Sequence, residues 1–147
     1  MTLSSSSSRR VFLKVLGAGA LLASCEEEGG TKPTGTFQVG TLSDLPMAGT
    51  VKVSATQAAA VFRDANGLYA MTLICTHEEC DIKASGSVTA TGLDCNCHGS
   101  RFDANGAVKQ GPATAPLEHF QVQLKPTGEI FVNADVPVPA DTRVAVM

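Results

Sequence analysis

Cys75-Thr76-His77-Glu78-Glu79-Cys80 is a short stretch in which two thiols and an imidazole lie within six residues. A second stretch, Cys95-Asn96-Cys97-His98-Gly99-Ser100, repeats this combination, and 17 residues separate His77 from Cys95. Thiolate and imidazole are the ligands that transition metals prefer, and no other part of the sequence concentrates them in this way. The sequence therefore predicts that the rest of the chain delivers, anchors and positions two metal-binding loops.

Residues 1–24 have the pattern of an export signal. Ser8-Arg9-Arg10-Val11-Phe12-Leu13-Lys14 is a charged opening, and the apolar run from 15 to 23 is too short for a permanent membrane span. The paired arginines followed by Phe-Leu-Lys resemble a twin-arginine signal, the type that exports folded proteins. An ordinary amphipathic N-terminal segment is the alternative interpretation.

The signal ends in Leu22-Ala23-Ser24-Cys25, which resembles a bacterial lipobox. The resemblance implies that Cys25 is lipidated and becomes the first residue of the mature protein, on the periplasmic or cell-surface side of a bacterial membrane. Several acyl chains on one cysteine would hold a domain there, since one chain alone binds only marginally. Residues 25–36 are polar and rich in Gly and Pro, which predicts a flexible tether.

The charge balance excludes one class of partner. The 147-residue chain has a formal net charge of −3, and residues 1–24 hold three basic and no acidic residues, so the mature chain carries −6. A polyanion needs a basic face on its protein, and nucleic acid is therefore not expected as a partner.

Five cysteines are an odd number, which needs an explanation in an exported protein. Assigning Cys25 to lipid leaves four, all within the two opening stretches. Two of them with the two histidines make a four-ligand site, and the other two would pair as a disulfide in an oxidising compartment.

The arrangement Cys-x-His-x17-Cys-x2-His, with an extra Cys in each loop, resembles a Rieske iron–sulfur protein. The resemblance implies a 2Fe-2S cluster in which Cys75 and Cys95 bind one iron and His77 and His98 bind the other. It also implies a Cys80–Cys97 disulfide between the two loops. Neutral imidazoles in place of thiolates raise the potential, to roughly −150 to +300 mV across the family.

Two other interpretations of these residues remain open at this point. Cys and His at such spacings also suit tetrahedral zinc, which would make the protein a non-redox zinc-binding lipoprotein. Alternatively, four cysteines form two structural disulfides beside surface histidines. The extra cysteines, Gly99-Ser100 and the downstream Gly111-Pro112-Ala113 favour the iron–sulfur interpretation.

Short apolar runs separated by turns predict an all-β domain of antiparallel sheets, with the two ligand loops forming a cluster-binding subdomain. A strand is expected at 51–53. Hairpins are expected around Asp64-Ala65-Asn66-Gly67, around the same tetrapeptide at 103–106, and around Pro126-Thr127-Gly128. The Rieske domain is predicted to span 37–134, followed by a C-terminal strand or tail at 135–147.

Several residues around the loops are expected to tune or enclose the cluster. Gly99 and Gly111 permit close approach of the backbone, and Gly111-Pro112-Ala113 resembles the family's proline loop, although an ordinary rigid turn is equally compatible. The resemblance implies that Ser100 corresponds to a serine of the Rieske family whose hydroxyl hydrogen-bonds a bridging sulfide, which raises the potential. Phe102 stands where quinol-oxidising relatives usually carry Tyr, so the potential should be lower here, and Phe102 is also expected to pack in the core.

The resemblance predicts a one-electron carrier without bond chemistry of its own. The chain is similar to stand-alone Rieske subunits such as the arsenite oxidase small subunit and the iron–sulfur subunit of cytochrome bc complexes. The expected partners are a cytochrome, a quinol oxidoreductase or a molybdenum-type enzyme subunit. Quinol oxidation is the alternative function. Quinol-oxidising members of the family usually have an apolar loop tip where this chain has Glu78 and Glu79, and two carboxylates oppose burial of the tip. They suit a cationic partner, or they belong to a solvated loop without a binding role.

An oxygenase component is a further alternative, which would need a mononuclear iron held by two His and a carboxylate. Only His119 remains once His77 and His98 are assigned. The histidine count therefore argues against hydroxylation chemistry, and His119 is expected to be structural or exposed.

Overall fold

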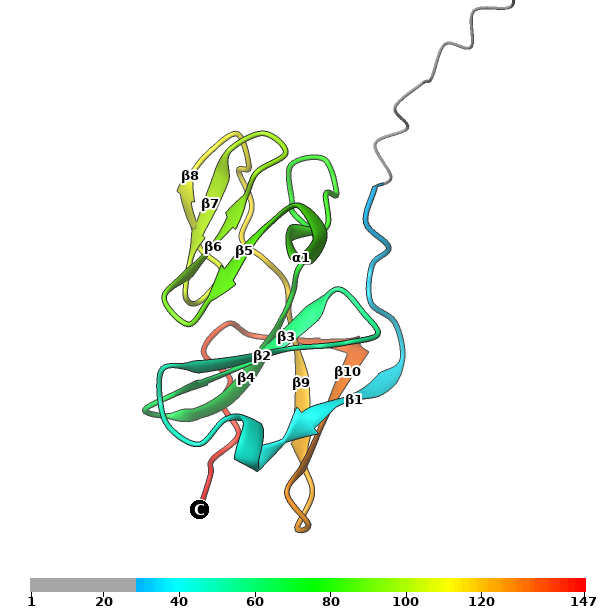
Figure 1. Cartoon of the computed structure of the whole chain (residues 1–147), viewed down its shortest axis with the longest axis vertical. Coiled ribbons are helices and arrows are strands. Elements are labelled where there is room, and N and C mark those ends of the chain that lie inside the picture. Colours follow the sequence, from blue (N-terminus) through cyan, green and yellow to red (C-terminus); the bar gives the residue numbers. More distant parts are fainter. Residues whose placement is uncertain (1–28) are drawn as a thin grey trace, which may run out of the picture.

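Ten strands and two short helical segments make up residues 29–147, the part of the chain described by a computed structural model (Figure 1). The predicted signal and Cys25 lie outside these residues. The elements are β1 (Thr36–Thr41), the 3-10 turn η1 (Leu42–Asp44), β2 (Thr50–Val53), β3 (Ala59–Asp64), β4 (Gly67–Thr72), α1 (Ile82–Ser85), β5 (Gly86–Thr89), β6 (Gly92–Cys95), β7 (Ser100–Asp103), β8 (Val108–Gln110), β9 (His119–Leu124) and β10 (Glu129–Val138).

The larger sheet has six antiparallel strands in the order β1-β10-β9-β4-β3-β2. Its strands come from two separate parts of the sequence, 36–72 and 119–138. The two parts join where β4 pairs with β9, through Ala70 opposite Phe120 and Met71 opposite His119. This pairing brings together the two ends of the segment that lies between residues 72 and 119.

The central strands β3 and β4 are buried on both faces. Successive side chains on a strand point to opposite faces, so Phe62 and Met71 join one apolar cluster while Val61 and Leu68 join another. A strand covered on both sides is apolar at nearly every position, which explains the continuous runs Ala-Ala-Val-Phe and Leu-Tyr-Ala-Met in these strands.

The smaller sheet has four antiparallel strands in the order β5-β6-β7-β8 and is inserted as one continuous segment between β4 and β9. Leu93 on β6 pairs with Phe102 on β7, and both side chains are buried. They belong to the apolar cluster that also contains Phe62 and Met71, so one core connects the two sheets. Figure 1 shows the small sheet and α1 at one end of the molecule and the large sheet at the other.

All three predicted hairpins are confirmed. The strand pairs are β3–β4, β7–β8 and β9–β10. In both Asp-Ala-Asn-Gly turns the aspartate carboxylate accepts hydrogen bonds from two backbone N–H groups. The donors are Asn66 and Gly67 in the first turn, and Asn105 and Ala107 in the second. The glycine of each turn has a positive φ. The predicted all-β class is therefore confirmed, and α1 amounts to a single turn.

Arg143, near the C-terminus, connects these two turns. Its Nε lies 2.6 Å from Asp64 Oδ2 in the first turn, and its terminal nitrogen donates to Asn105 Oδ1 in the second at 2.8 Å. The guanidinium also lies 3.8 Å from the centre of the Tyr69 ring. The C-terminal segment therefore connects the large sheet to the small one, through the two turns of identical sequence at 64–67 and 103–106.

The domain boundaries at 36/37 and 134/135 stay predictions. The nearest elements are β1, which begins at Thr36, and β10, which continues to Val138. No helix among residues 29–147 is long and apolar enough to cross a membrane.

Candidate metal centre

The first loop, Cys75–Cys80, follows β4 and precedes α1. Its backbone folds back on itself, since Cys75 N donates to Cys80 O at 2.9 Å and Glu79 N donates to Cys75 O at 3.0 Å. Glu79 has φ 59°, an uncommon value for a residue other than glycine. Asp81 then caps α1 by accepting from Lys83 N. The loop is thus fixed by its own hydrogen bonds at both ends.

The second loop, Cys95–Ser100, connects β6 to β7. Cys95 and Ser100 are paired across the two strands, and Gly99 N donates to Cys95 O at 3.0 Å. Gly99 has φ 85°, a conformation that glycine adopts without a steric penalty. Asn96 N donates to Ser85 O at the end of α1, which ties the second loop to the element that follows the first.

A disulfide joins the two loops. It links Cys80 to Cys97, the pair that the resemblance implies, with a Cα–Cα distance of 6.6 Å. The Ser85 hydroxyl lies 3.2 Å from Cys97 Sγ. Because the first loop precedes α1 and the second connects β6 to β7, this link fixes the relative position of two loops that are separate in the sequence.

Cys75 and Cys95 remain as free thiols, and both are buried. Burial raises the pKa of the Cys95 thiol and the adjacent Cys75 thiol raises it further, against the backbone N–H groups of Cys97 and His98, which face the sulfur and lower it. Two neighbouring buried thiols with backbone amides directed at one of them are suited to hold a soft metal as thiolates.

The imidazoles of His77 and His98 lie together at the end of the molecule, with ring centres 4.8 Å apart and an edge-to-face arrangement. His77 Nδ1 is buried and has no hydrogen-bond partner. His98 Nε2 lies 3.5 Å from Glu78 Oε2, which leaves its Nδ1 for another role. An unpartnered buried nitrogen is unfavourable unless a ligand satisfies it, so these rings are suited to bind a metal through Nδ1.

A third segment, 111–115, closes the side of the two loops. Ala113 N donates to Ser100 Oγ at 3.0 Å, and Thr76 Oγ1 donates to Ala115 O at 2.6 Å. Ser100 is fully buried and its hydroxyl hydrogen is still available to a further acceptor. An added Cβ at Gly111 would be in ordinary contact with Ala113, so the protein atoms alone do not require glycine there.

Phe102 is buried at the base of the second loop and packs in the apolar cluster. His119 lies elsewhere, on β9, stacked against Tyr69 with ring centres 6.0 Å apart. Burial lowers the pKa of His119, and the charge of Arg143 lowers it further. Among the described residues, the groups of potential metal ligands that lie close together do not include His119.

Two contacts of the site were not expected from the sequence. One is the contact of Glu78 with His98, which joins residues of different loops. The sequence shows acidic residues beside a histidine in the first loop, but it does not show that Glu78 lies near the histidine of the second. The other is Ser85 with Cys97, which depends on α1 and has no local sequence pattern.

Several known proteins and one domain family are similar to this chain. Residues 35–121 match the sequence profile of the Rieske 2Fe-2S domain. The chain is 45% identical over 51 residues (35% of the chain) to the cytochrome b6-f complex iron-sulfur subunit 2 of Nostoc sp.. It is 37% identical over 70 residues (48% of the chain) to the cytochrome b6-f complex iron-sulfur subunit of Synechococcus sp. (strain WH7803). These matches span 28% and 38% of the two relatives.

Among solved structures, the chain is similar to the cyanobacterial plasma membrane Rieske protein PetC3 from Synechocystis PCC 6803. The TM-score is 0.52 and the identity 27%, over 66% of this chain and 98% of that one. This likeness supports an all-β fold for the chain, with a larger antiparallel sheet and a smaller sheet beside the two loops.

Proposed function

Because the chain belongs to the Rieske 2Fe-2S domain family and has its fold, we propose that it is an exported, lipid-anchored one-electron carrier. The family membership establishes an electron-transfer domain with a 2Fe-2S cluster. The proposal adds the ligand residues, the route to the membrane and the class of partner.

The cluster is held by Cys75 and Cys95 through sulfur and by His77 and His98 through Nδ1. The observation that carries this assignment is the buried, unpartnered Nδ1 of His77 beside His98, in loops whose two remaining cysteines are free and buried. When bound, the cluster accepts and releases a single electron. The zinc alternative is not retained, since the family's cofactor is an iron–sulfur cluster.

The protein's own groups set the surroundings of these ligands. Ser100, buried and fixed by the amide of Ala113, offers its hydroxyl hydrogen to the site, which favours the more negative reduced state. Phe102 offers no hydrogen. We therefore expect the variant Phe102→Tyr, which adds a hydroxyl donor at the base of the second loop, to have a higher midpoint potential than the wild type in a redox titration.

Export and anchoring rest on the sequence of residues 1–25. The twin-arginine pattern would carry the folded protein across the membrane, and lipidated Cys25 would hold it there. Mass spectrometry of the mature N-terminus tests this directly. Acyl chains on Cys25 are expected in the wild type and none in the variant Cys25→Ser.

The partner is a cytochrome or another oxidoreductase with a cationic docking face. Glu78 and Glu79 are exposed at the end of the first loop, and Lys32 pairs with Glu79. The carboxylate of Glu78 therefore favours encounter with positive charge and opposes burial against an apolar surface. Electron transfer to a basic c-type cytochrome should therefore slow as salt is added, because the charges are screened.

Quinol oxidation is the second candidate, favoured by the likeness to the cytochrome b6-f iron-sulfur subunits. Reduction of the protein by a soluble quinol, at a rate insensitive to salt, would support this function over the first one.

The central experiment is a redox titration of exported protein followed by electron paramagnetic resonance. We expect equal amounts of iron and acid-labile sulfide in the wild type and loss of the reduced-cluster signal in Cys75→Ser and His77→Ala. His119→Gln is the matched control, since His119 lies outside the loops, and should keep the signal. Full cluster content in Cys75→Ser would contradict the ligand assignment.

A further inference from the structure

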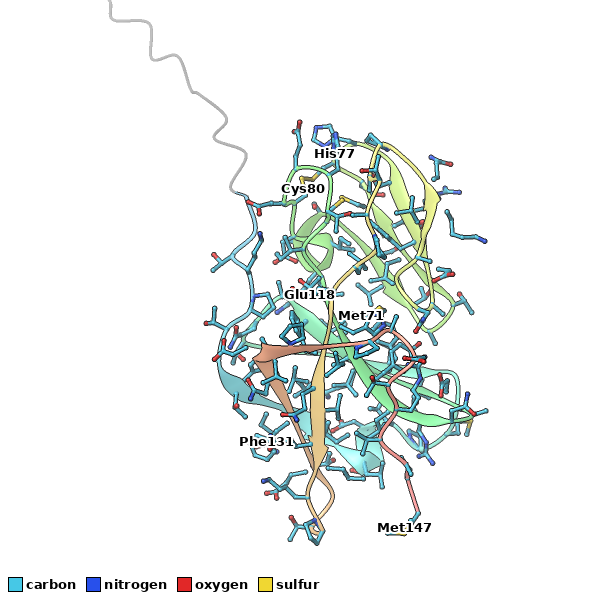
Figure 2. The ribbon with its side chains drawn as sticks, turned by 180° about the vertical axis from the view of Figure 1, so that it is seen from behind. Met71, His77, Cys80, Glu118, Phe131 and Met147 are labelled. Carbon is cyan, nitrogen blue, oxygen red and sulfur yellow. A yellow bond between two sulfur atoms is a disulfide. The ribbon has the colours of Figure 1, made fainter. Side chains whose placement is uncertain are left out.

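The first described residues of the chain run along the side of the cluster-binding end before they reach β1. We call residues 30–35 the N-terminal strap. Gly30 N donates to Glu79 O at 2.7 Å, and Lys32 Nζ lies 2.6 Å from Glu79 Oε1. The strap therefore attaches to the first ligand loop twice. Figure 2 labels His77 and Cys80 at this end, and Figure 1 shows the described chain starting beside it, in blue.

Gly30 is seated tightly against the loop. A Cβ added at Gly30 would lie 2.5 Å from Ile74 Cδ1 and 2.9 Å from Asp81 Cβ, closer than non-bonded atoms approach. A Cβ added at the neighbouring Gly29 would meet nothing within 4 Å. The backbone of the strap thus reaches a position at residue 30 that only glycine allows, one residue after a position open to any side chain.

The other end of the strap is attached to the large sheet. Thr34 and Gln57 exchange two hydrogen bonds, at 2.8 and 2.9 Å, and Gly35 N donates to Asp135 Oδ1 at 2.9 Å. A cavity of about 460 Å³ lies between the strap and the body, bordered by Pro33, Ile74 and other residues. The strap is consequently held at its two ends rather than along its whole length.

We propose that the strap ties the cluster-binding end of the domain to the membrane anchor, so that this end stays close to the lipid surface. This inference rests on the proposed lipidation of Cys25. Four residues lie between Cys25 and Gly30, which makes five steps along the chain, and a chain spans at most about 3.6 Å per residue. The loop that holds Glu79 therefore stays within about 20 Å of the lipidated residue, whereas the far end of the large sheet can lie farther away by the length of the domain.

The strap also changes which part of the domain is expected to lie near the membrane. If residues 25–35 were free, the domain would be attached at β1, and the ligand loops would be the part free to swing away. With the strap in place, the electron partner that fits this surface is one whose redox centre lies at the membrane, such as a protein embedded in the same bilayer.

The test compares two labels on the lipidated protein bound to phosphatidylcholine vesicles at high salt, which removes electrostatic orientation. A fluorophore is attached through a genetically encoded azido residue at Thr114, beside the first loop, or at Thr127, in the β9–β10 turn. Both threonines are exposed. Quenching by nitroxide-labelled lipid headgroups is measured for each label against the same vesicles without nitroxide.

We expect at least twofold stronger quenching at Thr114 than at Thr127, with this difference lost in Gly30→Val and kept in the matched control Gly29→Val. A second variant leaves the strap intact and inserts a ten-residue Gly/Ser linker between residues 28 and 29. It should reduce the difference without affecting folding, because only the connection to the anchor becomes longer.

Equal quenching at the two positions in the wild type, or stronger quenching at Thr127, would overturn the inference. Failure of the proposed anchor has a different signature, namely absence of acyl chains on Cys25 and no vesicle binding, and it would overturn the orientation together with the anchor. Quenching that is unchanged by both the linker and Gly30→Val would show that something other than the strap orients the domain.

Discussion

The two sheets of this protein are stabilised by different means. The six-stranded sheet has central strands buried on both faces, with side chains such as Phe62 and Leu68 almost fully enclosed. The four-stranded sheet contributes few large side chains to the core, chiefly Leu93 and Phe102, and is held by a disulfide and by loop hydrogen bonds. Apolar burial supports the scaffold, whereas covalent and polar links support the part that carries the chemistry.

The largest expected effect is on the large sheet. Phe62→Ala removes a fully buried aromatic ring from the core between the sheets. Such truncations lower the free energy of unfolding by about 3–5 kcal/mol, which urea denaturation would measure for the whole domain. Val136→Ala, at a position 37% exposed, is the control and should change it by less than about 0.5 kcal/mol. A similar loss in both variants would contradict the difference between core and surface.

The double variant Cys80→Ser/Cys97→Ser tests the small sheet. It removes a cross-link between residues 17 positions apart, which in the chain-entropy account contributes about 3 kcal/mol. We expect amide hydrogen exchange to increase in β5–β8 and to stay unchanged in the β9–β10 hairpin. Equal increases in both sheets would mean that they do not differ in how they are held.

Arg143→Ala removes one polar link between the sheets. Arg143 is 14% exposed and bonds to one turn in each sheet, so we expect a loss of about 1–3 kcal/mol in the free energy of unfolding. Arg101→Ala is the matched control, because Arg101 pairs with Asp94 at the surface and is 62% exposed. Surface pairs contribute about 0–1 kcal/mol. The interpretation fails if the two variants are equally stable.

The smallest expected effect is the pH dependence contributed by His119. Its pKa in the folded protein is lowered by burial and by Arg143, so the unfolded chain binds a proton more readily. The free energy of unfolding should therefore decrease as pH falls below about 6.5, the ordinary histidine pKa. The slope between pH 7 and 5 should be shallower in His119→Gln than in the wild type, with both in the same oxidised state. Identical slopes would exclude this contribution.

The sequence predicted the parts of the molecule whose signals are local. The turn at 64–67 and the two other hairpins follow from Asn-Gly and Pro-x-Gly between apolar runs. The all-β class and the Cys80–Cys97 disulfide were also anticipated, the latter from the family resemblance.

The missed features depend on contacts between residues far apart in the chain. Nothing near Arg143 indicates that it bridges Asp64 and Asn105, and the repeated tetrapeptide by itself predicts only two turns. The strap was missed for a similar reason. A polar segment rich in Gly and Pro is typical of a flexible tether, and only the position of Glu79 gives Gly30 and Lys32 their partners.

The insertion of the small sheet between β4 and β9 affects the order in which the protein can be assembled during synthesis. Residues 75–100, with both ligand loops, emerge from the ribosome before β9 and β10. The large sheet cannot close until those last two strands have been made, because β4 pairs directly with β9. Local contacts form faster than distant ones, so the loops can meet while the scaffold beneath them is still an open half-sheet.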